Sequence, residues 1–423
     1  MSRGADVVVV GGGVVGGAVA YYAARRGLRV TLVDQPKPGR ASSASAGGLW
    51  PLGESAGLGC GVIFHKAMVA SGAAAAGRGP EQLPQSFLDF AVRSNEMFPR
   101  LAEELREAAG MDIELETTSL LFLMYDGGDE DFARSLQQRW AGRRSQLEWL
   151  TPEAAAGAEP ALTRDLRGAL RFHGDDQVNP YRTADALRAG ARRHGARLLS
   201  HTEVTGIELE RGRVVAVRTR AERLPTGIVV NAAGAWAGQV AAMAGVEVPV
   251  RPVRGQIVCT ATLPPLLAAC VSTTDCYLAQ KQHGEVIIGS TTEEAGFDSG
   301  VTLTAIQTLC AGAVRAVPAL ADVEVKRVWS GLRPGSPDEL PILGPVDGPG
   351  GYLNACGHFR TGVLTAPLTG LMLAEIMMGE RPSYPVEPFL LSRFARAAAG
   401  GGSLERRDVA EAAEVAAGAR RHG

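Results

Sequence analysis

The first regular pattern along the chain is a short, unbroken apolar run that leads into a group of glycines. Val7–Val10 predict a strand, and Val14–Arg26 predict a helix that ends at Gly27. Leu28–Asp34 predict a second strand. Residues 6–34 therefore predict a β-α-β unit.

Further helices are indicated by apolar spacing and by end signals. In Asn95–Ala109 apolar residues recur every four positions, which predicts a helix with a core-facing stripe. Asn179 followed by Pro180 is typical of an N-cap and a first helical position, and Gly195 marks the end of that helix. Val363–Met378 predicts a last helix.

Strand patterns occupy much of the remaining sequence. A hairpin with Arg211 and Gly212 at its turn comes first, and a group of alternating strands begins near Val253. The predicted strands are Glu203–Glu210, Arg213–Thr219, Ile228–Asn231, Gln256–Thr260, Cys276–Gln280, Glu285–Ile288, Trp329–Arg333 and Gly351–Cys356.

These patterns predict an α/β protein with two joined domains and a tail. A discontinuous nucleotide-binding domain is expected to comprise residues 1–85, 150–248 and 329–395. An antiparallel-sheet domain inserted into it is expected to comprise residues 86–149 and 249–328. Trp329–Arg333 is predicted to return the chain to the first domain. Residues 396–423 are predicted to be a peripheral tail, flexible or docked to a partner.

The glycine group has the spacing of a dinucleotide-binding loop. Gly11 permits a tight turn, Gly13 lets the backbone approach a pyrophosphate, and Gly16 lets the helix pack closely on the strand. The free N–H groups at the helix N-terminus would receive the phosphates. Asp34, about 20 residues further on, is where an acid bonds a ribose hydroxyl. The motif predicts a dinucleotide but leaves open which one.

Composition and charge exclude several other classes of protein. With 423 residues and a net charge of −2, the chain has no electrostatic signature for nucleic acid or anionic lipid. Its six cysteines contain no Cys-x-x-Cys pair, so neither a disulfide framework nor an iron–sulfur cluster is expected. We find no secretory signal and no membrane-spanning run, and expect a cytoplasmic protein without metal.

Several segments together resemble the D-amino-acid-oxidase/glycine-oxidase superfamily of FAD enzymes. The segments that carry the likeness are Ala44–Trp50, Gly57–Phe64, Ala279–Lys281, Ile288–Glu293, Gly331–Pro341 and Asn354–Gly362. The resemblance extends to about residue 395 and implies a Rossmann-like FAD-binding domain with an inserted, antiparallel substrate domain. It also implies that Gly357–Gly362 closes onto the flavin ring, where N–H groups would stabilise negative charge.

The likeness implies non-covalent FAD held by both glycine loops and by the polar segment Arg40–Leu49. The predicted cofactor-binding residues are Gly11, Gly13, Val14, Val15, Gly16, Asp34, Gln35, Arg40, Ser42, Ser43, Ala46, Gly47, Gly48, Leu49, Val204, Ala232, Ala233, Gly234, Trp236, Arg333, Gly357, His358, Phe359, Arg360, Thr361, Gly362, Val363 and Leu364.

Three residues are predicted to be catalytic on the same likeness. Arg333 matches the arginine that grips the substrate carboxylate, for which a planar guanidinium is well suited. Tyr277 matches a substrate-side tyrosine, and Arg360 matches a residue between flavin and substrate. Thr292 matches a pocket-lining position, and residues 54–65 are expected near the cleft.

No motif identifies a general base, and hydride transfer from a neutral amine needs none. The histidines of interest are therefore expected to be structural, with His358 the best exception because of its place in the flavin loop; they are His65, His173, His283 and His358.

Within the superfamily the segments are most similar to the cyanide-forming glycine dehydrogenase subunits. This likeness implies hydride transfer from glycine to flavin N5, with hydrogen cyanide and CO2 as products. It further implies two partner subunits, a second FAD protein and an iron–sulfur protein, in a complex on the inner face of the cell membrane. Three alternatives remain: an oxygen-using glycine or D-amino-acid oxidase, an opine or D-hydroxyproline dehydrogenase subunit, and a non-catalytic FAD scaffold.

Overall fold

A twisted, mostly parallel sheet forms the first half of the molecule. The computed structural model describes residues 4–58 and 82–395. Within them this sheet has six strands, all parallel to their neighbours except β18, which is antiparallel to β19. In spatial order the strands are β18 (Ile342–Pro345), β19 (Tyr352–Cys356), β12 (Ile228–Asn231), β1 (Val7–Val10), β2 (Val30–Asp34) and β8 (Arg197–Ser200).

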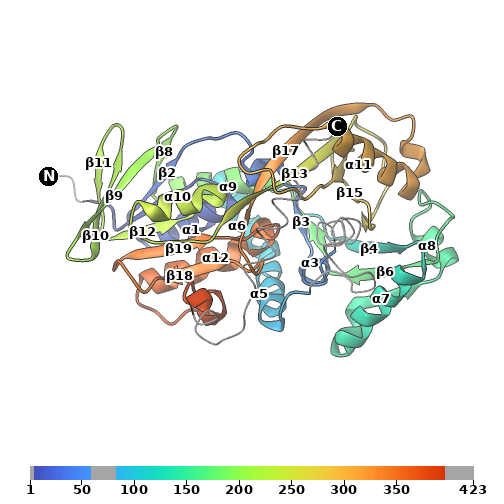
Figure 1. The fold of residues 1–423 in the computed structure, drawn as a ribbon, viewed down its shortest axis with the longest axis horizontal. Coiled ribbons are helices and arrows are strands. Elements are labelled where there is room, and N and C mark those ends of the chain that lie inside the picture. The colour runs from blue at the N-terminus through green and yellow to red at the C-terminus, as the bar shows by residue number, and fades with distance from the viewer. Residues whose placement is uncertain (1–3, 59–81, 396–423) are drawn as a thin grey trace, which may run out of the picture.

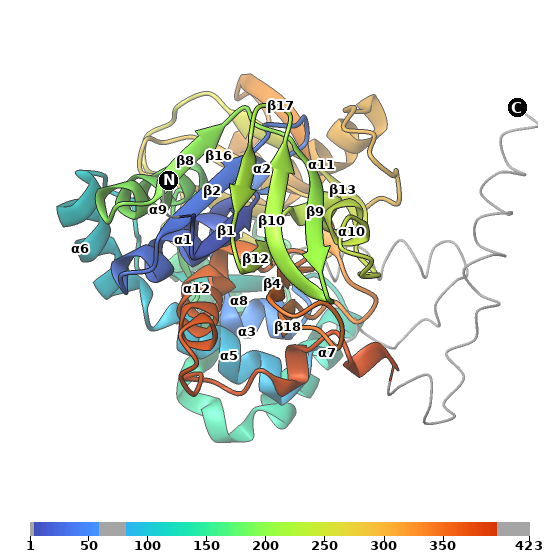
Figure 2. The same cartoon turned by 90° about the vertical axis from the view of Figure 1, so that its left-hand side faces the viewer.

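Both faces of this sheet are covered. Val7 and Val9 face a helical layer, whereas Val8 and Val10 face a second, smaller sheet, so all four valines are buried. The helical layer comprises α1 (Val14–Arg25), α5 (Gln85–Asn95), α6 (Phe98–Ala109), α9 (Pro180–Arg193) and α12 (Gly362–Met377). The other layer comprises β9 (Val204–Glu210), β10 (Arg213–Thr219), β11 (Arg223–Pro225) and α10 (Ala237–Ala242), and Figure 2 looks onto its strands.

Two local features predicted from the sequence, a helix N-cap and a hairpin turn, are present in these elements. Asn179 caps α9, because its side-chain oxygen accepts a hydrogen bond of 3.1 Å from the Arg182 N–H. Arg211 and Gly212 both have positive φ, as a tight hairpin turn requires. The predicted hairpin and the predicted N-cap are thus confirmed.

A second sheet of eight strands forms the other half of the described molecule (Figure 1). It is antiparallel except where β14 pairs with β4. In spatial order its strands are β17 (Val325–Gly335), β13 (Arg251–Thr260), β16 (Val286–Gly289), β15 (Tyr277–Gln280), β14 (Cys270–Ser272), β4 (Ser119–Met124), β6 (Gly168–His173) and β5 (Leu147–Leu150).

Side chains alternate between the two faces of this sheet as well. Val258, Leu278 and Ile288 pack under α11 (Leu303–Ala316). Ile257 and Tyr277 face the opposite way, toward the core that includes Trp50. This second face is the one that meets the nucleotide-binding half.

Shorter elements complete the described chain. A small sheet joins β3 to β7, and short helices occupy several connections. These elements are β3 (Gly48–Leu49), β7 (Asp176–Gln177), α2 (Ala41–Ala44), α3 (Pro51–Ser55), α7 (Gly127–Arg139), α8 (Pro152–Ala158), η1 (Ala141–Gln146), η2 (Gly234–Trp236), η3 (Pro318–Leu320) and η4 (Glu387–Phe389).

The structure corrects three parts of the predicted domain division. Trp329–Arg333 does not return to the first sheet, because β17 pairs along its length with β13. β6 likewise belongs to the eight-stranded sheet, although residues 150–248 were assigned to the nucleotide-binding domain. Helices α5 and α6 instead pack on the nucleotide-binding core. Local patterns cannot tell which sheet a strand joins, since that depends on partners remote in sequence. Residues 396–423 lie outside the described residues.

Candidate cofactor and active site

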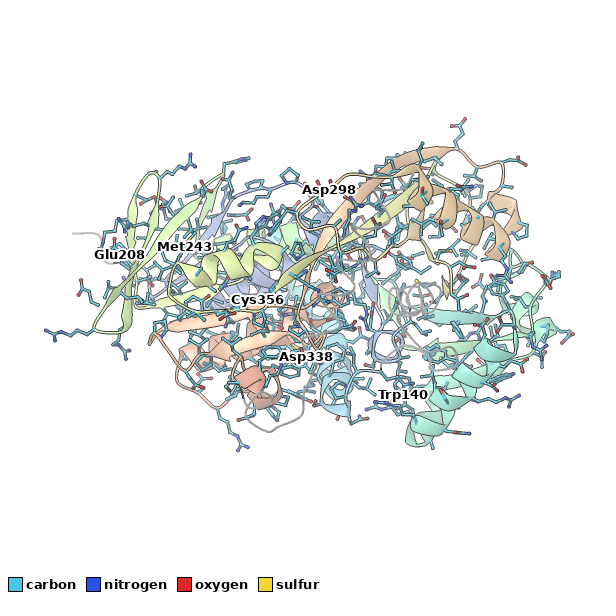
Figure 3. All side chains as sticks on the ribbon, in the orientation of Figure 1. Trp140, Glu208, Met243, Asp298, Asp338 and Cys356 are labelled. Atoms are coloured by element: carbon cyan, nitrogen blue, oxygen red, sulfur yellow. The ribbon has the colours of Figure 1, made fainter. Side chains whose placement is uncertain are left out.

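A large cavity lies where the two sheets meet. It encloses about 1730 Å³, its open mouth included, and receives side chains from both halves of the molecule. One end lies at the loop after β1, and the other lies against β13, β15 and β17. Met243 and Cys356 line it from the α10 and β19 sides, and both are labelled in Figure 3.

The glycine loop shapes the first end, called here the nucleotide end. Gly11 has a φ of +109°, and a Cβ there would lie 2.3 Å from the Ala232 carbonyl oxygen. A Cβ on Gly16 would lie 1.8 Å from the Gly11 carbonyl oxygen, so α1 approaches the loop as closely as a backbone can. The Gly12 N–H donates to Asp34 Oδ1 at 2.8 Å, and the Val14 N–H donates to Ser42 Oγ at 3.0 Å.

Positive side chains border the same end. Arg40 Nη1 lies 3.0 Å from Asp34 Oδ2, and both residues line the cavity. Lys37 stands over the Trp236 ring, 5.5 Å from its centroid. The N-terminus of α1, the glycine loop, and the positive charges of Arg40 and Lys37 together suit a ligand that carries phosphates.

Most of the residues predicted to bind a cofactor line this cavity. They are Gly11, Gly13, Val14, Val15, Asp34, Gln35, Arg40, Ser42, Ala46, Gly47, Gly48, Val204, Ala232, Ala233, Gly234, Trp236, Arg333, His358, Phe359, Arg360, Gly362 and Val363. The others, of which Ser43 is exposed, do not line it: Gly16, Ser43, Leu49, Gly357, Thr361 and Leu364. Leu49, Thr361 and Leu364 are buried, so they support the lining.

Arg333 forms part of the second end, called here the reacting end. Its Nη1 donates to the carbonyl oxygens of Thr291 at 3.0 Å and Arg254 at 3.4 Å, and its Nη2 donates to Ser290 Oγ. A Cβ on Gly255 would lie 2.3 Å from both terminal nitrogens of the guanidinium. The guanidinium is thus held over a glycine that leaves room for it.

Tyr277 contributes an aromatic wall beside Arg333. Its ring meets Trp50 edge to face, with centroids 5.6 Å apart, and both residues are buried. A Cβ on Gly289 would lie 2.4 Å from the Tyr277 hydroxyl oxygen. Tyr277 and Arg333 both line the reacting end, where the family resemblance led us to expect them.

Arg360 also lines the reacting end, where it is paired with acids. Its Nε donates to Glu54 Oε2 at 2.5 Å, its Nη2 donates to the Glu54 carbonyl oxygen at 3.2 Å, and its Nη1 contacts Glu339. The Arg360 side chain is 3% exposed. Burial raises the pKa of Glu54, while the positive charges of Arg360 and then Arg333 act against that rise.

Sequence reasoning missed the importance of Glu54. It lies in a stretch that the sequence places near the cleft, but no spacing marks this acid among its neighbours. Trp50 and Gly255 were also missed, and each matters only through a contact made with a distant segment. Residues 59–65 of the expected stretch lie outside the described residues, and Thr292 does not line the cavity.

The histidines do not supply an obvious base. His358 is buried beside Thr369, and burial lowers its pKa to about 3, so this imidazole is neutral. His173 pairs with Glu148 and His283 with Glu114, and neither lines the cavity. His65 lies outside the described residues. Cys356 lines the cavity, and burial raises the pKa of its thiol to about 12.

These features define a dinucleotide-dependent enzyme, and comparison with known proteins gives its family. Residues 6–376 match the family described as FAD dependent oxidoreductase, so the chain belongs to that family and uses FAD. The residues of the cavity fit this cofactor: the glycine loop would hold the pyrophosphate and Asp34 the ribose. The N-terminus of α12, which contributes Gly362 and Val363, would lie by the flavin ring.

Two groups of curated relatives stand out. The chain is 48% identical to hydrogen cyanide synthase subunit HcnC of Pseudomonas protegens, over 93% of this chain and 97% of the relative. It is 32% identical to glycine oxidase of Pseudomonas putida, over 91% of this chain and 97% of the relative. Among solved structures it is similar to glycine oxidase from Geobacillus kaustophilus, with a TM-score of 0.82, 32% identity and coverage of 92% and 98%. The resemblance noted in the sequence is thereby confirmed.

Proposed function

We propose that this chain is the glycine-oxidising subunit of a cyanide-forming enzyme. The overall change converts glycine to HCN, CO2, four protons and four electrons. It takes place in two steps, each releasing two electrons, with the imino acid between them. FAD, when bound, supplies the two-electron acceptor for each step.

The observation that carries the proposal is the distribution of identity. The chain is 48% identical in sequence to HcnC across 93% of its length, whereas it is 32% identical to the glycine oxidase of P. putida. Both relatives are covered almost completely, so the difference does not come from a shared fragment. The name of the first relative refers to the formation of hydrogen cyanide, and the name of the second refers to the oxidation of glycine.

In this proposal Arg333 binds the substrate carboxylate. Two parallel hydrogen bonds from a planar guanidinium would fix the orientation of glycine as well as its position. The contacts of Nη1 and Nη2 to Thr291, Arg254 and Ser290 hold the guanidinium in place before a ligand arrives. Tyr277 would place its hydroxyl beside the same carboxylate.

The apolar wall at the reacting end would protect the intermediate. Trp50, Ile257 and Tyr277 line it and are buried. We propose that they help to exclude water, since an imino acid that met water would hydrolyse to glyoxylate and ammonia. Retention would leave the imino acid available for the second oxidation.

We further propose that the electrons leave through two partner subunits, a second FAD protein and an iron–sulfur protein, assembled at the inner face of the cell membrane. HcnC is named as a subunit of a synthase, which supports a complex. Within residues 4–58 and 82–395 no group of three metal-ligating side chains is present, and no helix has the length and hydrophobicity needed to span a bilayer.

Anaerobic stopped-flow mixing of the flavin-loaded protein with glycine tests this function. We expect the flavin band to bleach and cyanide to be formed once an electron acceptor allows the second step. Glyoxylate and ammonia in stoichiometric amounts, without cyanide from the assembled enzyme, would contradict cyanide formation. Bleaching by an opine or by D-hydroxyproline, but not by glycine, would assign another substrate.

The alternative is an oxygen-using glycine oxidase. The TM-score of 0.82 to the glycine oxidase of G. kaustophilus is compatible with it, because the fold alone does not separate the two activities. Hydrogen peroxide formed from glycine by the isolated chain, at a rate matching flavin reduction, would support this alternative.

A further inference from the structure

The reacting end contains a buried carboxylate to which the proposed function gives no role. Glu54 lies in α3 and is 8% exposed, yet it lines the cavity together with Arg333 and Tyr277. Within the described part of the chain, Arg360 Nε donates a hydrogen bond to Oε2 of this carboxylate. Oε1 is thereby left with its lone pairs available to a ligand.

The charged groups around Glu54 form a nearly balanced set. Arg360 lies between Glu54 and Glu339, and the Arg333 charge also acts on Glu54. Asp175 is the other nearby acid; burial raises its pKa well above the usual value, and the backbone N–H groups of Leu52 and Gly53 donate to it. Arg360 thus contacts both Glu54 and Glu339, and Arg333 acts on Glu54 through its charge.

This arrangement is complementary to an amino acid rather than to a simple carboxylate. If Arg333 takes the carboxylate of a zwitterion, the ammonium group enters the same buried space and requires an anion there. Glu339 does not line the cavity, and its side chain is 35% exposed. Among the described residues that line the reacting end, Glu54 supplies the buried carboxylate.

We propose that Glu54 binds the α-ammonium group of the substrate and accepts one of its protons. The inference rests on the proposed function, whose substrate is an amino acid. In this step one N–H bond of the ammonium breaks and an O–H bond forms at Oε1 of Glu54. The nitrogen keeps the electron pair, and the total charge of the cavity does not change. The resulting neutral amine is the form from which a hydride can leave the α-carbon.

The environment of Glu54 suits both parts of this role. Desolvation raises its pKa, which makes the carboxylate a better base than one in water. The Arg360 contact at 2.5 Å fixes the side chain and favours the charged form before substrate binds. The positive charge of Arg360 acts against this rise in the pKa.

Two ligands separate this role from a structural one. Acetate carries only the carboxylate, and glycine carries both charges. In the flavin-loaded protein, acetate binding is measured from the shift that it causes in the flavin spectrum. Glycine binding is measured from the dependence of the rate of flavin reduction on glycine concentration. We expect Glu54→Gln to weaken glycine binding by roughly 10- to 100-fold and to leave acetate binding unchanged or tighter.

Glu339→Gln is the matched control, because it also removes a carboxylate from Arg360 but lies outside the cavity lining. We expect this variant to keep the wild-type ratio of glycine to acetate affinity. If Glu54→Gln weakens both ligands equally, or if both variants change the ratio alike, the ammonium site is wrong.

The pH profile gives a second readout. Reduction of Glu54→Gln by glycine should be slow at neutral pH and should recover in alkaline solution, where glycine enters with a neutral amine. A Glu54→Gln profile parallel to the wild-type profile would overturn proton transfer. If glycine does not reduce the wild-type flavin, the proposed function fails, whereas the glycine-to-acetate ratio, then read from the flavin spectrum alone, still decides the ammonium site.

Discussion

The two ends of the cavity are built in different ways. The nucleotide end is made mainly of backbone groups and small side chains, with Gly11, Gly13, Asp34 and Ser42 close together in sequence and residues 232–236 completing it. The reacting end is made of large and charged side chains from separate segments, namely Glu54, Tyr277, Arg333 and Arg360. A local motif therefore forms the centre of the nucleotide end, whereas the reacting end depends on the correct union of two sheets.

This comparison predicts that damage to the two ends is separable. A change at the nucleotide end should release the cofactor, and a change at the reacting end should keep the cofactor but impair the reaction.

Gly16→Ala should be the most damaging single change. Its Cβ would lie 1.8 Å from the Gly11 carbonyl oxygen, so α1 and the loop must move apart. We expect a loss of roughly 3 kcal/mol or more in the free energy of unfolding, with loss of bound flavin. Thermal unfolding and the ratio of flavin to protein absorbance measure both. Gly157→Ala, where a Cβ meets nothing within 4 Å, is the control and should retain flavin.

Arg333→Lys should affect the other end alone. A lysine cannot make two parallel bonds to a carboxylate, so the efficiency of flavin reduction by glycine should fall roughly 100-fold or more. Flavin content should stay near that of the wild type. Arg327→Ala, an exposed change in the same strand β17, is the control. Equal damage from both variants would mean that the strand, and not the guanidinium, carries the effect.

His358 should make the fold sensitive to acid. Its imidazole titrates at about 3 in the folded protein and near 6.5 when unfolded, so the unfolded chain binds the proton first as pH falls. Stability should be fully present above pH 6.5 and should fall by roughly 2 kcal/mol between about pH 6.5 and 5. Denaturant unfolding of wild type and His358→Asn, with FAD in excess, measures this. Parallel pH curves would show that His358 does not cause the loss.

Ser42→Ala should have the smallest effect, confined to cofactor affinity. The Val14 N–H would lose its acceptor at 3.0 Å, which should weaken FAD binding by about 5-fold. Ser43→Ala should change nothing measurable, because Ser43 donates to the Arg40 carbonyl and does not line the cavity. FAD titration of the two apoproteins compares them. A larger effect from Ser43→Ala would restore its predicted place among the cofactor contacts.

The same comparison explains how much the sequence could predict. The expected roles of Gly11, Gly16 and Asp34 follow from spacing; Gly11 and Asp34 line the cavity, and Gly16 lies where α1 approaches the loop. Arg333 and Tyr277 were found through family resemblance rather than through any local pattern. Glu54 was missed, because its importance arises from Arg360, which is 306 positions away.

The errors in the fold have a similar origin. Trp329–Arg333 was correctly predicted to be a strand, but its sheet was wrong. Its partner β13 lies far away in sequence, and the length of the strand does not distinguish between the two sheets. Element type follows from local periodicity, whereas sheet membership follows from long-range pairing.

The most direct test of the account is a crystal structure of the flavin-loaded protein with acetate bound. We expect FAD along the whole cavity, with its pyrophosphate at Gly11–Gly16 and its ring beside Tyr277 and Arg360. Acetate should lie on the guanidinium of Arg333, with space between its methyl group and Glu54 for an amine. Acetate bound away from Arg333, or a flavin ring outside the reacting end, would show that the substrate does not bind where we place it.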